Sequence, residues 1–395
     1  MNFRFEYLAV PCGGAVVGMV LNERGSEDLP HLGSTAAAAL AAVVAVLAVV
    51  VLSRAGTAAG AGVAGSVAAG AALVSVPLLI SGTPGLFASG TGAGLILGGL
   101  LVLCTSRRSL QAALAVGVLL GSLGPVSTTP RRYADYLPDG EGLGSSTMWL
   151  LLAATVGFTL LCLPVRLRVE ASELRALIVG LALPALMLLV HWVFGLSIDD
   201  RSYPGATWQA TVAWSVVVAA VVGGAVWLPR ATGLVLVAGL AIAAVDPQPV
   251  FVTDRWLVVV VVSTSLPGLF AGWRWPKPVV GIGLLAVVAG VGLADEGLVA
   301  IALPSVAAFV LASSLPAPGG VAVPALLAPV LIVVPYTADV GWTAYSGQFG
   351  WVAIGPTQAA LVVADVAAFA TIAVCALAAW LLTRRVGSVA VQNGG

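Results

Sequence analysis

Long apolar stretches, broken by short polar segments, run along almost the whole chain. A helix that crosses the hydrocarbon core of a bilayer needs about 20 mainly apolar residues, and a window of that length finds about 14 candidate segments. They lie near residues 5–22, 34–53, 58–81, 84–104, 108–127, 147–165, 174–197, 207–228, 231–246, 255–273, 278–294, 297–315, 320–338 and 358–383. Segments 5–22 and 231–246 are the weakest, so about 12 or 13 spans is the alternative. The pattern predicts an all-α polytopic membrane protein.

Composition excludes an ordinary soluble globule. Hydrophobic residues make up 60% of the chain and charged residues 9%, and the mean hydropathy is +1.07. Soluble domains carry about 25% charged residues, so this chain has too little polar surface to cover a core of its size. The 17 basic and 17 acidic residues balance to a net charge of zero and form no basic stripe, which argues against a nucleic-acid partner. The expected partner is the lipid bilayer.

The distribution of basic residues predicts the orientation of the spans. If the N-terminus is cytoplasmic and all the segments cross, most of the 17 basic residues fall in cytoplasmic loops. The exceptions are Arg24, Arg131, Arg132, Arg201 and Arg255. Because Lys and Arg are enriched in the cytoplasmic loops of membrane proteins, we expect a multi-pass protein of the cell (plasma) membrane. Its N- and C-termini are both expected in the cytoplasm.

One stretch of sequence goes beyond composition. Residues 86–125 combine a Gly-rich span, a short basic turn and a second span that holds Gly117, Gly121, Gly124 and Pro125. This stretch resembles the fourth and fifth helices of the major facilitator superfamily. The antiporters of that family carry a Gly-x-x-x-Gly and Gly-Pro signature in the fifth helix, where it acts as a gating motif.

A second stretch, residues 268–293, resembles the cytoplasmic turn between the second and third helices of that family's C-terminal bundle. The first-half equivalent at 52–65 is degenerate, because it keeps Arg54 but lacks the family's Asp and its Arg cluster. A layout of six, two and six helices would resemble the drug/proton antiporter branch of this family, which has fourteen helices.

The resemblance implies a layout for the whole chain. Residues 1–165 would form an N-terminal six-helix bundle, and 232–395 a C-terminal six-helix bundle. Residues 166–231 would be a linker with two transmembrane helices. The implied activity is secondary transport, with proton-coupled export of a small or amphiphilic molecule.

Two titratable residues inside predicted spans are candidates for proton or substrate binding. Asp365 lies in the last span, and His191 lies in the seventh. Ionisable side chains are costly within a bilayer and mark function there. Asp365 could carry a proton or bind a cationic substrate, and His191 could bind a ligand or sense pH. The alternative for each is a hydrogen bond to a neighbouring helix or at the membrane interface.

Enzyme signatures are missing from the sequence, so we expect no catalytic residues, metal ion or cofactor. Lys277 is the only lysine, and GTGAG at 90–94 has no βαβ unit around it. The chain has no HExxH motif, and its four cysteines form no CxxC pair. The pair Asp199 and Asp200 on an outer loop is the one feature that leaves a membrane transferase open.

Secondary transport of an unidentified small molecule is thus the favoured function. The main alternative is a non-catalytic integral membrane subunit or scaffold of a larger assembly, with a membrane protein as its partner. The poverty of charge within the spans favours that alternative. A flippase for lipid-linked saccharides is less favoured, because no basic residue lies deep in a span.

Overall fold

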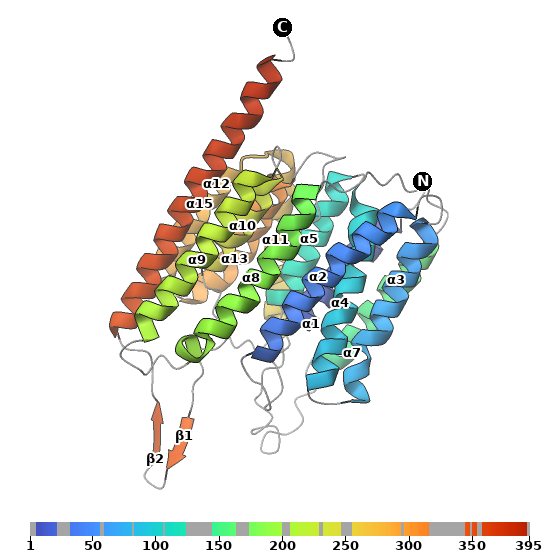
Figure 1. The fold of residues 1–395 in the computed structure, drawn as a ribbon, viewed down its shortest axis with the longest axis horizontal. Helices are drawn as coiled ribbons and strands as arrows, with labels where there is room; N and C mark the ends of the chain where they lie inside the picture. Colours follow the sequence, from blue (N-terminus) through green and yellow to red (C-terminus); the bar gives the residue numbers. More distant parts are fainter. Residues whose placement is uncertain are drawn as a thin grey trace.

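The fold is known from a computed structural model. It describes residues 5–21, 32–55, 59–80, 83–105, 107–123, 144–162, 174–199, 206–228, 232–245, 255–293, 296–315, 344–347, 350–353 and 358–392. Nearly all of these residues are helical, and the helices run up and down in one bundle (Figure 1). The helical fold is therefore confirmed.

The helices of the first half of the chain coincide with the predicted segments. They are α1 (Glu6–Leu21), α2 (Leu32–Arg54), α3 (Ala59–Val74), α4 (Thr83–Cys104), α5 (Arg108–Leu123) and α7 (Gly144–Leu161). The segment predicted at 58–81 is divided into α3 and the short 3₁₀ helix η2 (Val76–Leu78). Pro77 lies in η2 and has no N–H to donate, which explains why the α-helix stops there.

The second half is helical in the same way. Its helices are α8 (Leu174–Asp199), α9 (Ala206–Trp227), α10 (Gly233–Ala244), α11 (Arg255–Arg274), α12 (Pro278–Gly292), α13 (Glu296–Ser314) and α15 (Gln358–Gln392). The segment predicted at 320–338 lies outside the described residues. An antiparallel hairpin, β1 (Ala344–Gly347) and β2 (Gly350–Ala353), was not predicted, and it projects from the end of the bundle opposite to the C-terminus (Figure 1).

Within the residues that the structure describes, three stretches are long and apolar enough to cross a membrane: Ala36–Arg54, Thr83–Cys104 and Asp365–Arg385. The other apolar helical stretches found among these residues are 10–17 residues long. Many large apolar side chains on the outside of the bundle are exposed, for example Val51, Leu150 and Phe270. Such a surface suits contact with lipid tails better than contact with water. The expectation of fourteen spans goes further than these three and stays a prediction.

Helix pairing follows the same order in the two halves of the chain. In the first half, the second and fourth helices pack together (α2 with α4), as do the third and fourth (α3 with α4). Two helices pack against the last helix of this half, α7: the first helix, α1, and the third, α3.

The corresponding pairs recur in the second half. If α10 is counted as its first helix, α11 packs against α13, and α12 also packs against α13. The last helix, α15, packs against both α10 and α12, which correspond to α1 and α3. The correspondence thus extends to four pairs of helices.

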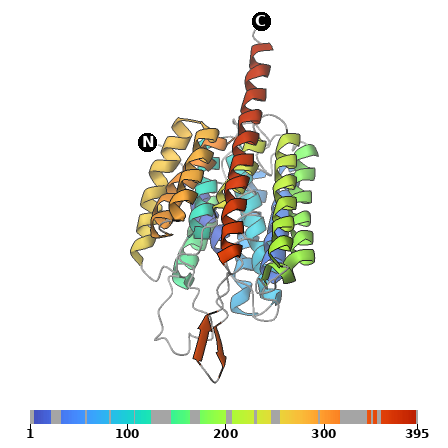
Figure 2. The ribbon, with the colours of Figure 1, turned by 90° about the vertical axis from the view of Figure 1, so that its left-hand side faces the viewer.

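Helices α8 and α9 lie between these two groups. Helix α8 packs against α2 and α9, and α9 packs against α10 and α15. In the view along this side, α15 stands between α9 and the group of α11, α12 and α13 (Figure 2). The indole Nε1 of Trp214 on α9 donates to Thr371 Oγ1 on α15 at 2.8 Å, and both residues are buried.

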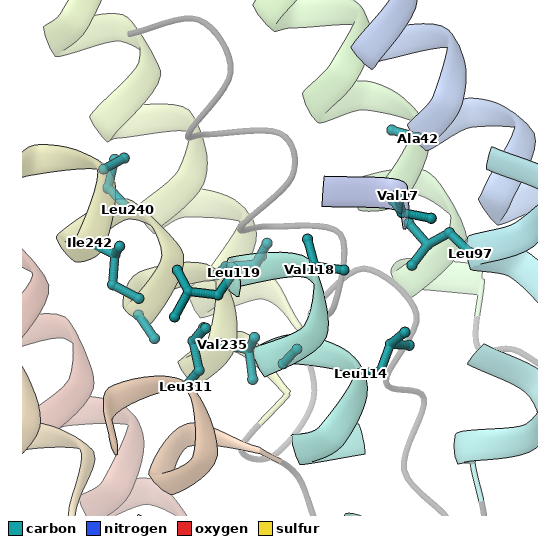
Figure 3. Close-up of a cluster of buried hydrophobic side chains, with 14 of the residues drawn as sticks. Val17, Ala42, Leu97, Leu114, Val118, Leu119, Val235, Leu240, Ile242 and Leu311 are labelled. Carbon is teal, nitrogen blue, oxygen red and sulfur yellow. The ribbon is translucent and has the colours of Figure 1, made fainter. Parts of the chain in front are cut away.

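The two groups share one continuous apolar core. Leu119 of α5, Val235 of α10 and Leu311 of α13 belong to the same cluster of buried hydrophobic residues, and each is at most 1% exposed (Figure 3). The core continues through α1, α2 and α4, where Val17, Ala42 and Leu97 are fully buried. Direct contacts of α5 with α11 and α13 also join the groups.

Candidate functional site at the basic end of the bundle

Basic side chains gather at one end of the helix bundle. Those whose side chains the structure describes are Arg54, Arg107, Arg108, Arg175, Arg274, Lys277, Arg384 and Arg385. They lie at the C-terminal ends of α2 and α11, in the last third of α15, and at the N-terminal ends of α5, α8 and α12. In a bundle whose helices alternate in direction, these helix ends share one side, here named the basic end. The opposite side, from which β1 and β2 project, is the hairpin end (Figure 1).

An ion pair at the basic end connects the start of α1 to the start of α5. Arg107 Nη1 donates to Glu6 Oε2 at 2.7 Å, and Glu6 is 8% exposed. Beside this pair, Tyr7 Oη on α1 and Ser109 Oγ on α5 are 2.9 Å apart and hydrogen-bonded. A carboxylate that is buried against a guanidinium in this way keeps its charge compensated. The pair therefore neutralises Arg107.

Arg108, the next residue, reaches across to the second half of the chain. Its Nη2 donates to the carbonyl oxygens of Ala312 at 3.2 Å and Ser313 at 3.4 Å, which belong to the last turn of α13. The carbonyls at the end of a helix lack partners within the helix and carry its partial negative charge, so a cation is stabilised there. In the part of the chain that the structure describes, Arg108 has no carboxylate partner.

A buried polar side chain lies one turn deeper on α5. Gln111 is fully buried, and neither its Nε2 nor its Oε1 has a hydrogen-bond partner among the described residues. The Nε of Arg108 is buried without a partner as well. Buried hydroxyls elsewhere in the bundle donate to the carbonyl one turn back, as Thr155 does to Leu151 at 2.6 Å. Gln111 differs from them, and an unmade hydrogen bond of this kind costs about 1–3 kcal/mol.

The position of Gln111 on the helix places it between the two arginines. Residues three and four apart share a helix face, so Gln111 lies below both Arg107 and Arg108. Because Arg107 faces α1 and Arg108 faces α13, Gln111 lies toward the junction of these helices with α5.

The residues proposed from sequence for proton or substrate binding lie elsewhere. Asp365 is on α15 toward the hairpin end, is half-buried, and precedes by one turn Phe369, which lies beside Gly290 of α12. His191 is on α8, a helix that packs against α2 and α9. Helices α8 and α15 both pack against α9. Neither residue joins the cluster at the basic end.

Two glycines of the proposed gating motif, Gly117 and Gly121, face α1. A Cβ on Gly117 would lie 2.6 Å from the carbonyl oxygen of Pro11, and one on Gly121 would overlap the carbonyl oxygen of Ala15. The backbones of α1 and α5 therefore approach each other directly, within one half of the chain. Gly124 and Pro125 lie outside the described residues.

From the sequence, Arg107 and Arg108 were interpreted only as basic residues of the short turn within 86–125, and Gln111 was not identified as a candidate. One signal for Gln111 was available, because it is a polar residue with a long side chain inside an otherwise apolar span. The contact between Arg108 and α13 joins positions 204 residues apart. The local sequence pattern therefore could not predict it.

The structure offers no built metal centre in the regions that it describes, since no three His, Cys, Asp or Glu side chains are grouped there. The four cysteines are free thiols. In comparisons with known proteins, no family model matches the chain, and no curated protein matches its sequence.

Proposed function

We propose that this protein is a secondary membrane transporter whose two halves alternate access to a substrate path between them. The observation that carries the proposal is the repeated pairing of helices, in which α2 with α4 corresponds to α11 with α13. Secondary transporters are commonly built from two repeats of one helical unit, and substrate sites lie where the repeats meet.

The direction of the helices supports the same proposal. Both α1 and α10 begin at the basic end, so the two halves have the same orientation. Repeats of this kind are related by an axis along the membrane normal. The proposed layout is a six-helix bundle at 1–165, a linker with two spans at 166–231 and a second six-helix bundle at 232–395. The basic end is assigned to the cytoplasm, since basic residues collect there.

The proposed activity is proton-coupled export of a small or amphiphilic molecule. Asp365 is the proposed protonation residue. Glu6 is compensated by Arg107, whereas Asp365 lies half-buried in a long apolar helix. Carboxylates within membrane spans are frequent members of proton relays.

Distance measurements between the halves test this function without a known substrate. Arg54 and Arg274 are exposed residues at the basic ends of α2 and α11, one in each half. Spin labels at these positions, with the protein in nanodiscs, should report two distance populations whose ratio changes between acidic and alkaline pH. The same labels on Asp365→Asn should report populations that no longer respond to pH. One narrow distance under all conditions would rule out alternating access.

A non-catalytic membrane subunit is the second candidate. The continuous apolar core between the two halves favours it, because Leu119, Val235 and Leu311 belong to one cluster of buried hydrophobic residues (Figure 3). A static subunit predicts that single narrow distance, together with a stable complex with another membrane protein on purification in mild detergent.

A further inference from the structure

We propose that Arg108 and Gln111, at the N-terminal end of α5, bind the anionic group of a monoanionic carboxylate with an apolar body. This inference rests on the proposed transport function and names the class of its substrate. Three separate features of the basic end support it: the unused donors of Arg108, the partnerless Gln111 and the local balance of charge.

Arg108 has hydrogen-bonding capacity that its present contacts do not use. A guanidinium has five N–H donors, yet the contacts of Arg108 to the described residues use only Nη2, at 3.2 and 3.4 Å. These distances are at or beyond the long end of the usual range, whereas a guanidinium and a carboxylate approach to about 2.7–2.9 Å. The buried Nε has no hydrogen-bond partner in the part of the chain that the structure describes. A carboxylate could take Nε–H and one Nη–H together, in the bidentate geometry that arginine favours.

Gln111 supplies the second element of the site. Its amide is fully buried, has no hydrogen-bond partner among the described residues, and lies one turn from Arg108 on the same side of α5. An Nε2–H of Gln111 can donate to a carboxylate oxygen that is already held by Arg108. The N-terminal end of the sixteen-residue helix α5 adds favourable potential for an anion.

The balance of charge selects a monoanion. Of the two neighbouring arginines, Arg107 is already compensated by Glu6, so Arg108 alone offers its positive charge to a ligand held by Gln111. A dianionic phosphate in the same place would need a second cation beside Arg108. Leu110 and Leu114 of α5 and Leu311 and Leu315 at the end of α13 are buried around this level of the bundle. They suit an apolar ligand body better than a hydrated one.

Binding at this site would also release the contact between the two halves. The carboxylate replaces the carbonyls of Ala312 and Ser313 as the acceptor for Arg108, and the bond from α5 to α13 is broken. The ligand would thus favour the conformation that is open at the basic end. A ligand shifts such an equilibrium by its difference in affinity for the two states.

Thermal unfolding of the full-length protein in nanodiscs, followed by tryptophan fluorescence, tests the site with defined probes. Sodium hexanoate should raise the unfolding temperature in a saturable manner. Hexanamide, which has the same body without the charge, should not, and inorganic phosphate should have little effect. Arg108→Gln should weaken the apparent affinity for hexanoate by about tenfold or more. Arg54→Gln, at an exposed arginine of the same end, should leave it unchanged.

Gln111→Leu separates a binding role from a structural one. Replacing a partnerless buried amide with an apolar side chain of similar size should keep or raise the stability of the ligand-free protein. It should nevertheless weaken hexanoate binding. Arg108→Lys retains the charge but not the bidentate geometry, so it should retain part of the affinity for hexanoate. This variant serves as the test if Arg108→Gln fails to fold.

Equal effects of hexanoate and hexanamide, or unchanged hexanoate affinity in both Arg108→Lys and Gln111→Leu, would overturn the site. A stronger response to phosphate than to hexanoate would overturn the ligand class. If the spin labels on Arg54 and Arg274 still alternate, these results overturn the site and leave the transport function standing. Hexanoate binding in a protein whose halves never alternate would support the site and refute the transport function.

Discussion

Asp365 and Glu6, the two carboxylates whose side chains the structure describes, have different surroundings. Glu6 is paired with Arg107 at 2.7 Å, whereas Asp365 is half-buried on α15. The ion pair already engages Glu6 with Arg107. We therefore place the proposed protonation at Asp365 rather than at Glu6.

Replacing Asp365 with Asn should abolish proton-driven coupling while membrane insertion and folding remain intact. Asn keeps the shape of the side chain and removes its ability to cycle a proton. Proton flux into liposomes that contain the purified protein is the measurement, with unfolding temperature as the control for folding. Wild-type proton flux in Asp365→Asn would remove the assignment. Loss of folding would instead indicate a structural hydrogen bond.

The Glu6–Arg107 pair should contribute measurably to stability. Glu6→Ala leaves the guanidinium of Arg107 at the basic end without its charged partner, and hydrogen bonds to charged groups contribute about 1.5–3 kcal/mol. A double-mutant cycle with Arg107→Ala, measured as free energies of unfolding, isolates the coupling between the two side chains. A coupling near zero would mean that solvent screens this pair completely.

At the scale of helices, close packing through small residues connects α4 to its neighbours. On α4, Gly94 and Gly98 face α2, where Ala41 and Ala45 present their carbonyl oxygens. Without a side chain on α4, the two backbones come close enough for van der Waals contact along the helix. Helix α11 packs against α13 in the same way, because Gly268 of α11 lies against the backbone carbonyl of Ser305.

Gly94→Ala should therefore destabilise the protein, and Gly65→Ala should not. The new methyl group on Gly94 would overlap the carbonyl oxygen of Ala41 and lie 2.9 Å from the Cβ of Val44. Overpacking of this kind costs about 1–3 kcal/mol. A Cβ on Gly65 meets no atom within 4 Å, and Ala is the better helix former by about 1 kcal/mol. Unfolding temperatures of the two variants in nanodiscs, compared with wild type, give the test.

For the whole molecule, the arrangement of helix ends predicts which surfaces are accessible from each side of the membrane. Lys277 is exposed at the basic end between α11 and α12, and Leu79 is 87% exposed after η2, toward the hairpin end. Cysteines at these two positions, in a variant without native cysteines, should react with an impermeant reagent from opposite sides of the cell membrane. Cysteines introduced within 128–146 and 166–173 should differ in the same way. Reaction of both members of a pair from one side would contradict the proposed orientation.

The positions of the helices were determined by the sequence itself. An apolar run of about 20 residues predicts a helix by its length, because strands are much shorter. The predicted segments agree with α1 and α2 to within two residues at each end. Segment 58–81 was predicted too long, because hydropathy does not register the break at Pro77.

The tertiary structure alone decided which helices became neighbours and which polar groups met. The contact from Arg108 to α13 depends on two positions far apart in the chain and on the direction in which each helix presents its side chains. The burial of Gln111 arises in the same way, from the packing of α5 among other helices. An apolar run specifies that a helix forms, but in a chain that is apolar on nearly every face it does not specify which face turns inward. That choice is made by shape complementarity between helices, and it is expressed only when all of them have packed.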